Sequence, residues 1–170
     1  KGDIHAKGNP HIQLEPRNIA TVAKALSSRL AAIDPANAEY YQSRAADFQA
    51  RWSSAMARWE TLGAPLRGKQ VVVIHKDQAY LCRWLGLQQV AAIEPKPGVP
   101  PSAGHLAELV TRLSASPPSA ILRNAYNDPK APDWLSQRIK VPVVTLPFSV
   151  CHPSPSAPHW KSAPIRPTRG

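Results

Sequence analysis

The chain has few residues of several types, and each shortage excludes a class of protein. Its only two cysteines, Cys82 and Cys151, are too few and too far apart for a disulfide framework or a Cys-x-x-Cys metal site. No run of about 18 apolar residues occurs, so we expect no membrane-spanning segment. The start at Lys1 shows neither an initiator methionine nor the apolar core of a signal peptide, so we expect no signal peptide in this chain.

Acidic residues are also scarce, with 11 Asp and Glu against 21 Lys and Arg, and the formal net charge is +10. A basic chain can bind nucleic acid because lysine and arginine neutralise phosphates. Here the basic residues are scattered, and no zinc-finger or RNP pattern accompanies them. We therefore expect no nucleic-acid partner, and a basic nucleic-acid-binding protein is kept only as an alternative.

The first part of the chain predicts two helices. With 43% apolar residues, 170 residues suffice for one domain with a core. From Asn18 to Ile33 the apolar residues recur every three or four positions, which predicts an amphipathic helix. A second helix over residues 36–62 would be roughly 40 Å long, which is longer than a small domain is wide, so it must bridge something. Its apolar face comprises Tyr41, Ala45, Phe48, Trp52, Ala55, Trp59 and Leu62.

After residues 63–68, short apolar runs alternate with helical stretches, which is typical of a parallel α/β sheet. Right-handed crossovers place the strand ends carrying His75, Glu94 and Asn124 at one edge of this sheet. The expected strands are 70–74, 89–93, 120–124 and 141–146, and the expected helices are 78–85, 102–113 and 133–139.

The last twenty residues differ from the rest. Residues 151–170 are rich in proline and serine and contain no acidic residue, so we predict a disordered tail. Cys151, His152 and His159 have donors for a soft metal, but such a tail has no ordered backbone to position them.

Two histidines are the strongest candidates for a functional site. His11 ends the sequence Gly-Asn-Pro-His at residues 8–11, where the proline stiffens the turn. His75 follows the apolar run 71–74, at the strand end where open α/β folds bind their ligands. A lone histidine is more often a hydrogen-bonded polar residue than a metal ligand, so the predicted metal site depends on the pair.

The order of short motifs resembles that of the zinc and manganese substrate-binding proteins of bacterial ABC transporters, the cluster A-I periplasmic family. The resemblance covers roughly residues 3–150 and depends on the whole series, because no single motif is specific. The motifs are Gly-Asn-Pro-His-Ile at 8–12, Glu-Pro-Arg-Asn-Ile at 15–19, Asp-Pro-Ala-Asn at 34–37, Val-Val-Ile-His-Lys at 72–76, Trp-Leu-Gly-Leu at 84–87, and the segment 93–102 with Glu-Pro-Lys-Pro-Gly.

This resemblance implies a fold of two α/β lobes joined by one long helix, with the metal between the lobes. Residues 1–35 would be the remnant of the first lobe, 36–62 the interlobe helix, 63–150 the C-terminal lobe, and 151–170 the tail. The fold class expected for this chain is therefore α/β, a long linking helix plus one lobe with a parallel sheet.

The resemblance also implies a function and a site. The chain would be the non-catalytic, periplasmic or extracytoplasmic component that captures zinc and passes it to an ABC transporter permease. His11 and His75 would be metal ligands, while His5 and Glu94 would lie around them. A histidine rather than a carboxylate at position 75 favours Zn²⁺, with Mn²⁺ as the less favoured ion.

The chain departs from the family pattern at both ends. Family members have more of the first lobe, with another histidine ligand, and a late acidic ligand in a Gly-rich segment. We expect that this chain is truncated at its N-terminus and that a frameshift or divergence follows Val150. It would then keep two of four ligands and bind metal weakly. The helix over 18–33 would lose its packing partner, which favours self-association.

A metal-dependent hydrolase is the second alternative, with His11, His75 and Glu94 as its machinery. Catalytic zinc normally has three protein ligands, and the chain has no His-Glu-x-x-His motif to supply them. Glu94 is also consistent with a purely local role, in which its carboxylate pairs with Lys96 or caps a turn.

Overall fold

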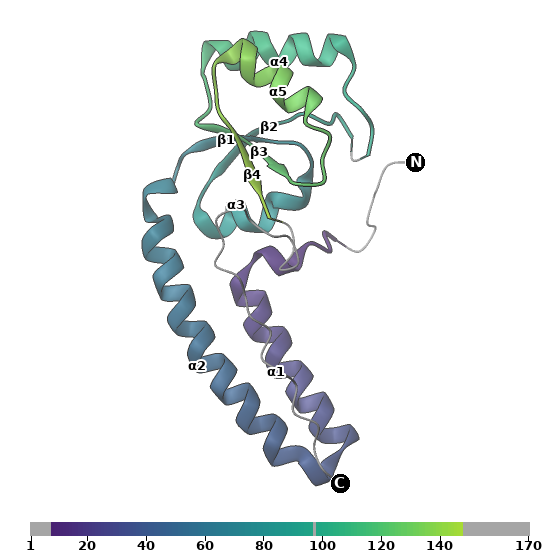
Figure 1. Ribbon diagram of the computed structural model, residues 1–170, viewed down its shortest axis with the longest axis vertical. Coiled ribbons are helices and arrows are strands. Elements are labelled where there is room, and N and C mark those ends of the chain that lie inside the picture. The colour runs from purple at the N-terminus through teal and green to yellow at the C-terminus, as the bar shows by residue number, and fades with distance from the viewer. Residues whose placement is uncertain (1–7, 97, 148–170) are drawn as a thin grey trace.

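The computed structural model describes residues 8–96 and 98–147. A helical hairpin of α1 and α2 extends from a lobe that contains a four-stranded sheet (Figure 1). His5, the predicted tail, and Cys151, His152 and His159 in that tail lie outside the described residues. Among the described residues, no helix combines the length and the apolar character needed to cross a membrane.

The hairpin consists of α1 (Pro16–Ile33) and α2 (Ala38–Gly63). Proline at the first position of α1 costs nothing, because the N–H it lacks has no helical partner there. Between the helices, the Oδ2 of Asp34 accepts hydrogen bonds from Asn37 Nδ2 and Tyr41 OH, both at 2.8 Å. These two bonds lower the pKa of Asp34. Residues Pro35–Asn37 form a 3-10 turn, so the long helix begins at Ala38 and not at residue 36.

The apolar face of α2 packs on α1 over most of its length. The rings of Phe48 and Trp52 stack at 5.3 Å, and Trp52 Nε1 donates a 2.8 Å hydrogen bond to the carbonyl of Pro16. Because α1 starts at Pro16, the last turns of α2 extend past it towards the lobe. Trp59 lies edge-on to Trp84 of the lobe at 6.4 Å, whereas Leu62 is 75% exposed.

The expected parallel α/β sheet is confirmed. The strands are β1 (Gln70–Val73), β2 (Gln88–Ala92), β3 (Ala120–Asn124) and β4 (Val143–Leu146), all parallel and in the order β2-β1-β3-β4. The helices between them are α3 (Ala79–Leu85), α4 (Ala103–Ala115) and α5 (Lys130–Ile139). Gly86 ends α3 with φ of 70°, and Ser102 caps α4 by accepting a hydrogen bond from the His105 N–H.

The sheet is covered on both faces, and its core lies on the α4 and α5 side. Helices α4 and α5 lie together on one face and α3 lies on the other (Figure 1). Leu109 and Leu113 of α4 and Leu135 and Ile139 of α5 pack on Val72 and Ile121 of the strands. A smaller cluster on the α3 side is made by Val71, Val73, Cys82 and Leu122. Because all four strands are parallel, their carboxyl ends lie at one edge of the sheet, which the loop before α1 approaches.

Candidate metal centre

The loop that carries His11 is tied to the carboxyl end of β1 by hydrogen bonds. Asn9 Nδ2 donates to the carbonyl of Lys76 at 2.9 Å, and Tyr80 OH donates to the carbonyl of Asn9 at 3.1 Å. The other side-chain atom of Asn9, Oδ1, accepts from the His11 N–H at 3.0 Å, which shapes the turn. Asn9 therefore joins two segments that are 67 residues apart and fixes where the His11 loop lies.

The structure brings His11 and His75 together. Their ring centroids are 6.0 Å apart, and the rings meet edge to face at 86°. His75 lies directly after β1, in extended conformation at the start of the 3-10 turn Lys76–Gln78. Neither residue is fully exposed, so the lobe and the loop partly enclose the pair.

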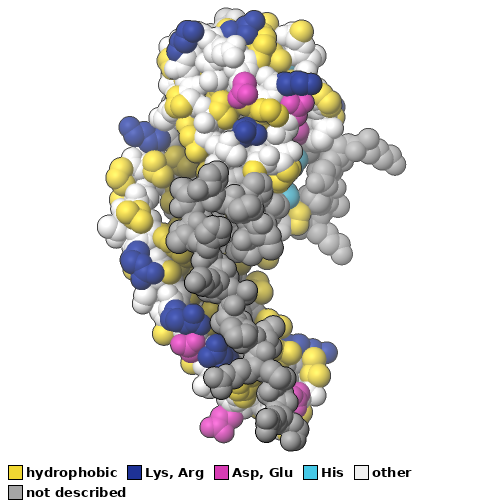
Figure 2. All heavy atoms as spheres, viewed as in Figure 1, with side chains coloured by type: hydrophobic (Ala, Val, Ile, Leu, Met, Phe, Trp, Pro, Cys, Tyr) yellow, Lys and Arg dark blue, Asp and Glu magenta, His cyan; other side chains and the backbone are white. Residues whose placement is uncertain are grey.

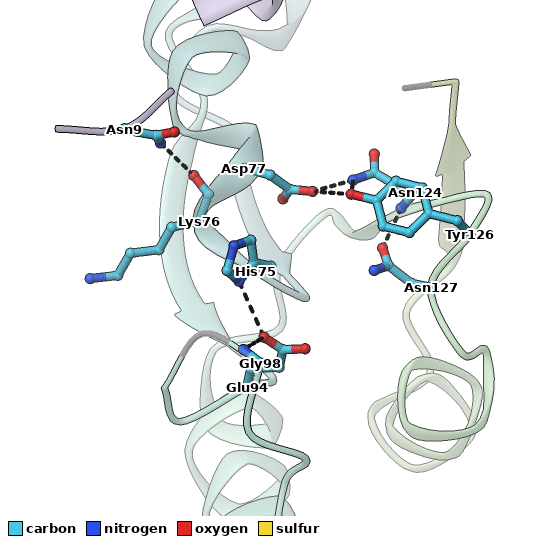
Figure 3. Close-up of polar contacts among 9 residues, drawn as sticks. All are labelled: Asn9, His75, Lys76, Asp77, Glu94, Gly98, Asn124, Tyr126 and Asn127. Carbon is cyan, nitrogen blue, oxygen red and sulfur yellow. Dashed lines mark hydrogen bonds and ion pairs between the residues drawn. The ribbon is translucent and has the colours of Figure 1, made fainter. Parts of the chain in front are cut away.

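Glu94 contacts His75 from the neighbouring strand end (Figure 3). Its Oε2 lies 3.2 Å from His75 Nδ1 and also accepts a 2.9 Å hydrogen bond from the Gly98 N–H. Because a carboxylate can only accept, this contact requires a proton on Nδ1, and in that tautomer of a neutral imidazole the lone pair is on Nε2. Among the described residues, Glu94 makes no ion pair with Lys96, so its partners are the histidine and the turn that it caps.

A second polar cluster lies at the same edge, where β1 and β3 end. Asn124 Nδ2 and Tyr126 OH both donate to Oδ2 of Asp77, the latter at 3.1 Å (Figure 3). Gln78 Nε2 donates to the Oδ1 of Asn124. Asp77 and Asn124 are 2% and 1% exposed, so these two members of the network are buried, whereas Tyr126 is 62% exposed. Sequence reasoning placed Asn124 at this edge but missed Asp77 and Tyr126. The signal for Asp77 was an acidic residue two positions after His75.

Burial and nearby charge act in opposite directions on the pKa of Asp77 and in the same direction on the pKa of Tyr126. Burial raises the pKa of Asp77, and the hydrogen bond from Tyr126 together with the positive charges that His75 and His11 can carry opposes this rise. The pKa of Tyr126 is raised, first by burial and then by the charge of Asp77. The acidic group thus interacts electrostatically with both histidines, although it bonds directly to neither.

Three further features concern the other possible metal-binding groups, His105 and a cavity beside Glu94. In the described part of the chain, no group of three or more His, Cys, Asp or Glu is arranged to hold a metal ion together. His105 lies in the first turn of α4, where its backbone bonds to Ser102. Beside Glu94 a cavity of about 410 Å³ opens, and its walls include Ile74, Ile93, Pro100, Leu106 and Trp134.

Known proteins share this sequence pattern and fold. Residues 1–157 match the protein family described as zinc-uptake complex component A, periplasmic (ZnuA). The high-affinity zinc uptake system protein ZnuA of Bacillus subtilis (strain 168) is 26% identical over 131 residues, which are 77% of this chain and 41% of that protein. A putative metal-binding protein of Treponema pallidum (strain Nichols) is 26% identical over 138 residues, 81% of this chain and 44% of that protein.

Solved structures of ZnuA and of a related substrate-binding protein are similar in fold to this chain. A crystal structure of ZnuA superposes with a TM-score of 0.74 at 26% identity, covering 83% of this chain and 53% of that one. The substrate-binding protein FpvC of Pseudomonas aeruginosa in complex with Mn²⁺ superposes with a TM-score of 0.71 at 26% identity, covering 82% and 53%. The chain therefore spans about half the length of the proteins it matches.

Proposed function

The chain belongs to the family of periplasmic zinc-uptake complex component A proteins, and we propose that it acts as the metal-binding part of an extracytoplasmic solute-binding protein. In this proposal it captures a metal ion and delivers it to the permease of an ABC transporter. The observation that supports it most is the convergence of His11 and His75 at one edge of the sheet. Two imidazoles from distant segments meet there, that of His75 directly after β1 and that of His11 on a loop that Asn9 holds in place.

The spacing of this pair suits a metal ion. With Zn–N bonds of about 2.0 to 2.1 Å, two imidazoles on one tetrahedral zinc have ring centroids roughly 5 Å apart. The observed 6.0 Å needs only a small adjustment of either ring. We propose His11 and His75 as the metal ligands, and Glu94 as the group that orients His75 so that Nε2 faces the ion. His5 remains a predicted neighbour of the site.

Zinc is the ion that this donor set favours. Imidazole nitrogen suits Zn²⁺, whereas Mn²⁺ prefers carboxylate and carbonyl oxygen. The related FpvC was crystallised with Mn²⁺, so selectivity needs a direct test. We expect Zn²⁺ to displace Mn²⁺ from this chain in a competition, and preferential retention of Mn²⁺ would contradict the assignment.

The other roles follow from the family. Its description names a component of a zinc-uptake complex, so we propose a transport protein with no catalytic activity, located outside the cytoplasm. The family match gives no support to a hydrolase or a nucleic-acid-binding protein. On the face shown in Figure 2, lysine and arginine side chains are spread along both the hairpin and the lobe, without the single patch that phosphate binding would use.

The decisive experiment is a competitive zinc titration of the 170-residue chain against a chromogenic chelator. We expect weak zinc binding by the wild type, as a site with two protein ligands should give, and its loss in the variant His11→Ala/His75→Ala. The matched control is His105→Ala, which removes an imidazole from α4 and should bind zinc like the wild type. Equal binding by the wild type and the double variant would contradict the proposed site.

We further propose that the chain self-associates through α1. Val22, Leu26 and Ile33 of this helix are 46%, 56% and 63% exposed, so the hairpin presents apolar side chains to solvent. Sedimentation of the wild type and of Leu26→Glu tests this. We expect concentration-dependent oligomers that the charge abolishes, and a monomeric wild type at all concentrations would contradict the proposal.

A further inference from the structure

Two residues on one face of α3 contact the segment that carries His11. Tyr80 and Arg83 are three positions apart, so their side chains leave the helix on the same side. The Arg83 guanidinium lies over the Tyr80 ring, 5.2 Å from its centroid. From this face, Tyr80 OH donates a 3.1 Å hydrogen bond to the carbonyl of Asn9, and Arg83 Nη2 lies 3.7 Å from Oε2 of Glu15.

These two contacts lie on either side of His11 in the chain. Asn9 comes two residues before it and Glu15 four residues after it, and the backbone between forms the 3-10 turn Ile12–Leu14. The side chain of Glu15 is only 5% exposed, so this end of the segment is packed into the protein. Because the loop between the two contacts is short, fixing both of its ends leaves few positions for His11.

The element that holds this segment begins at the other histidine. His75 directly precedes the 3-10 turn Lys76–Gln78, and α3 follows at Ala79. The carbonyl of Lys76 accepts the hydrogen bond from Asn9 Nδ2 (Figure 3). The stretch 75–83 thus carries one of the two imidazoles and holds the segment of the other.

We propose that this face of α3 is a clamp, made by Tyr80 and Arg83, that positions His11 for metal binding together with His75. This inference rests on the proposed function and adds two positioning residues to it. Two imidazoles from separate segments bind one ion tightly only when both are held near it, because the second bond then forms at a high effective concentration. Loosening the clamp should therefore lower the metal affinity even though both imidazoles remain in the chain.

A general stabilising role for Tyr80 and Arg83 predicts a different result. In that case their variants would destabilise the lobe as a whole, and the strands would lose protection from hydrogen exchange. Under our proposal, only the segment 9–15 detaches, and the strands keep their protection. Hydrogen exchange of the metal-free protein therefore separates the two roles.

The experiment compares Tyr80→Phe and Arg83→Gln with the wild type in the full chain. Zinc affinity is measured by chelator competition, and hydrogen exchange of the metal-free protein by mass spectrometry. Tyr80→Phe keeps the ring and removes one hydrogen bond, so we expect it to bind zinc about 3- to 10-fold more weakly. For Arg83→Gln we expect a loss of roughly 2- to 5-fold, because the Arg83 side chain is 69% exposed. In both variants the segment 9–15 should exchange faster than in the wild type.

Two matched controls remove the same chemical groups elsewhere. Tyr41→Phe removes a tyrosine hydroxyl that donates to Asp34 at the corner of the hairpin. Arg138→Gln removes an arginine that lies over the Trp134 ring, 3.6 Å from its centroid. Both controls should match the wild type in zinc affinity and in the exchange of the segment 9–15.

Each contrary outcome has a defined meaning. Wild-type exchange of the segment 9–15 in both variants would overturn the clamp. Faster exchange of this segment with unchanged zinc affinity would overturn its role in metal binding. Faster exchange throughout the strands would overturn the proposal in favour of a general stabilising role. Failure of the wild type itself to bind zinc would contradict the proposed function, and hydrogen exchange would still decide whether Tyr80 and Arg83 hold the segment.

Discussion

The lobe and the hairpin bury their apolar residues very differently. In the lobe, Val72, Ile121 and Leu135 are 0% exposed and pack in one cluster between the sheet and its helices. In the hairpin, whose residues 16–63 are all described, the buried helical residues are Pro16 and Gly63 alone, and large side chains such as Leu26 and Leu62 are more than half exposed. The lobe therefore has a core of its own. The hairpin is stabilised by the one interface between α1 and α2 and by a few hydrogen bonds.

The largest expected difference comes from one leucine in each region. Leu135→Ala should lower the free energy of unfolding by about 2 to 5 kcal/mol, because it leaves a cavity in a closed core. Leu26→Ala should lower it by less than about 1 kcal/mol, because that side chain is already 56% exposed. Urea unfolding followed by circular dichroism measures both. Similar losses at the two positions would mean that the hairpin is as well packed as the lobe.

A smaller effect is expected where the two helices are held together. Trp52→Phe removes the 2.8 Å hydrogen bond to the Pro16 carbonyl and should cost about 1 kcal/mol. Hydrogen exchange should show faster exchange in α1 and α2 and unchanged protection in the strands. Trp59→Phe is the matched control, since the Trp59 indole makes no hydrogen bond within the described residues. Faster exchange throughout the lobe would show that the two regions unfold together.

The smallest effect is expected at the corner of the hairpin, and it depends on pH. The pKa of Asp34 is lowered by its bonds from Asn37 and Tyr41, so its stabilising effect is complete above the ordinary value of 3.8. The effect is lost as the pH falls through the lowered value. Thermal unfolding of the wild type and Asp34→Ala should therefore differ at pH 7 and converge as the pH falls through the lowered pKa of Asp34. A gap that persists at low pH would show that the charge of Asp34 contributes nothing.

The secondary structure was largely predictable because its signals are local. The alternation of apolar runs and helical stretches located all four strands of the described sheet, and Gly86 and Ser102 marked helix ends. The errors were local too. Residues Pro35–Asn37 form a 3-10 turn before the long helix, and β4 begins at Val143, after a proline that has no N–H to donate.

The candidate site was predictable in part. His11 and His75 were named because each follows a stiff turn or a buried strand, and the structure places their rings 6.0 Å apart. Whether they bind metal remains a prediction. Asp77 and Tyr126 were missed because their contact requires β1 and β3 to be neighbours, which spacing along the chain does not state. The periodicity predicts Leu62 on the packed face of the long helix, but the structure exposes it. The apolar pattern continues along α2 beyond Pro16, where α1 begins and the contact between the two helices stops.

The sequence by itself determined the elements, their parallel arrangement and the edge where the polar residues gather. Hydrophobic periodicity and chain breakers are properties of neighbouring residues, and crossover handedness follows from the chirality of the chain. The tertiary structure alone decided the strand order, the burial of Asp77 and the approach of the His11 loop to β1 through Asn9. Those features depend on contacts between residues far apart in the chain, and such contacts leave no periodic mark in the sequence.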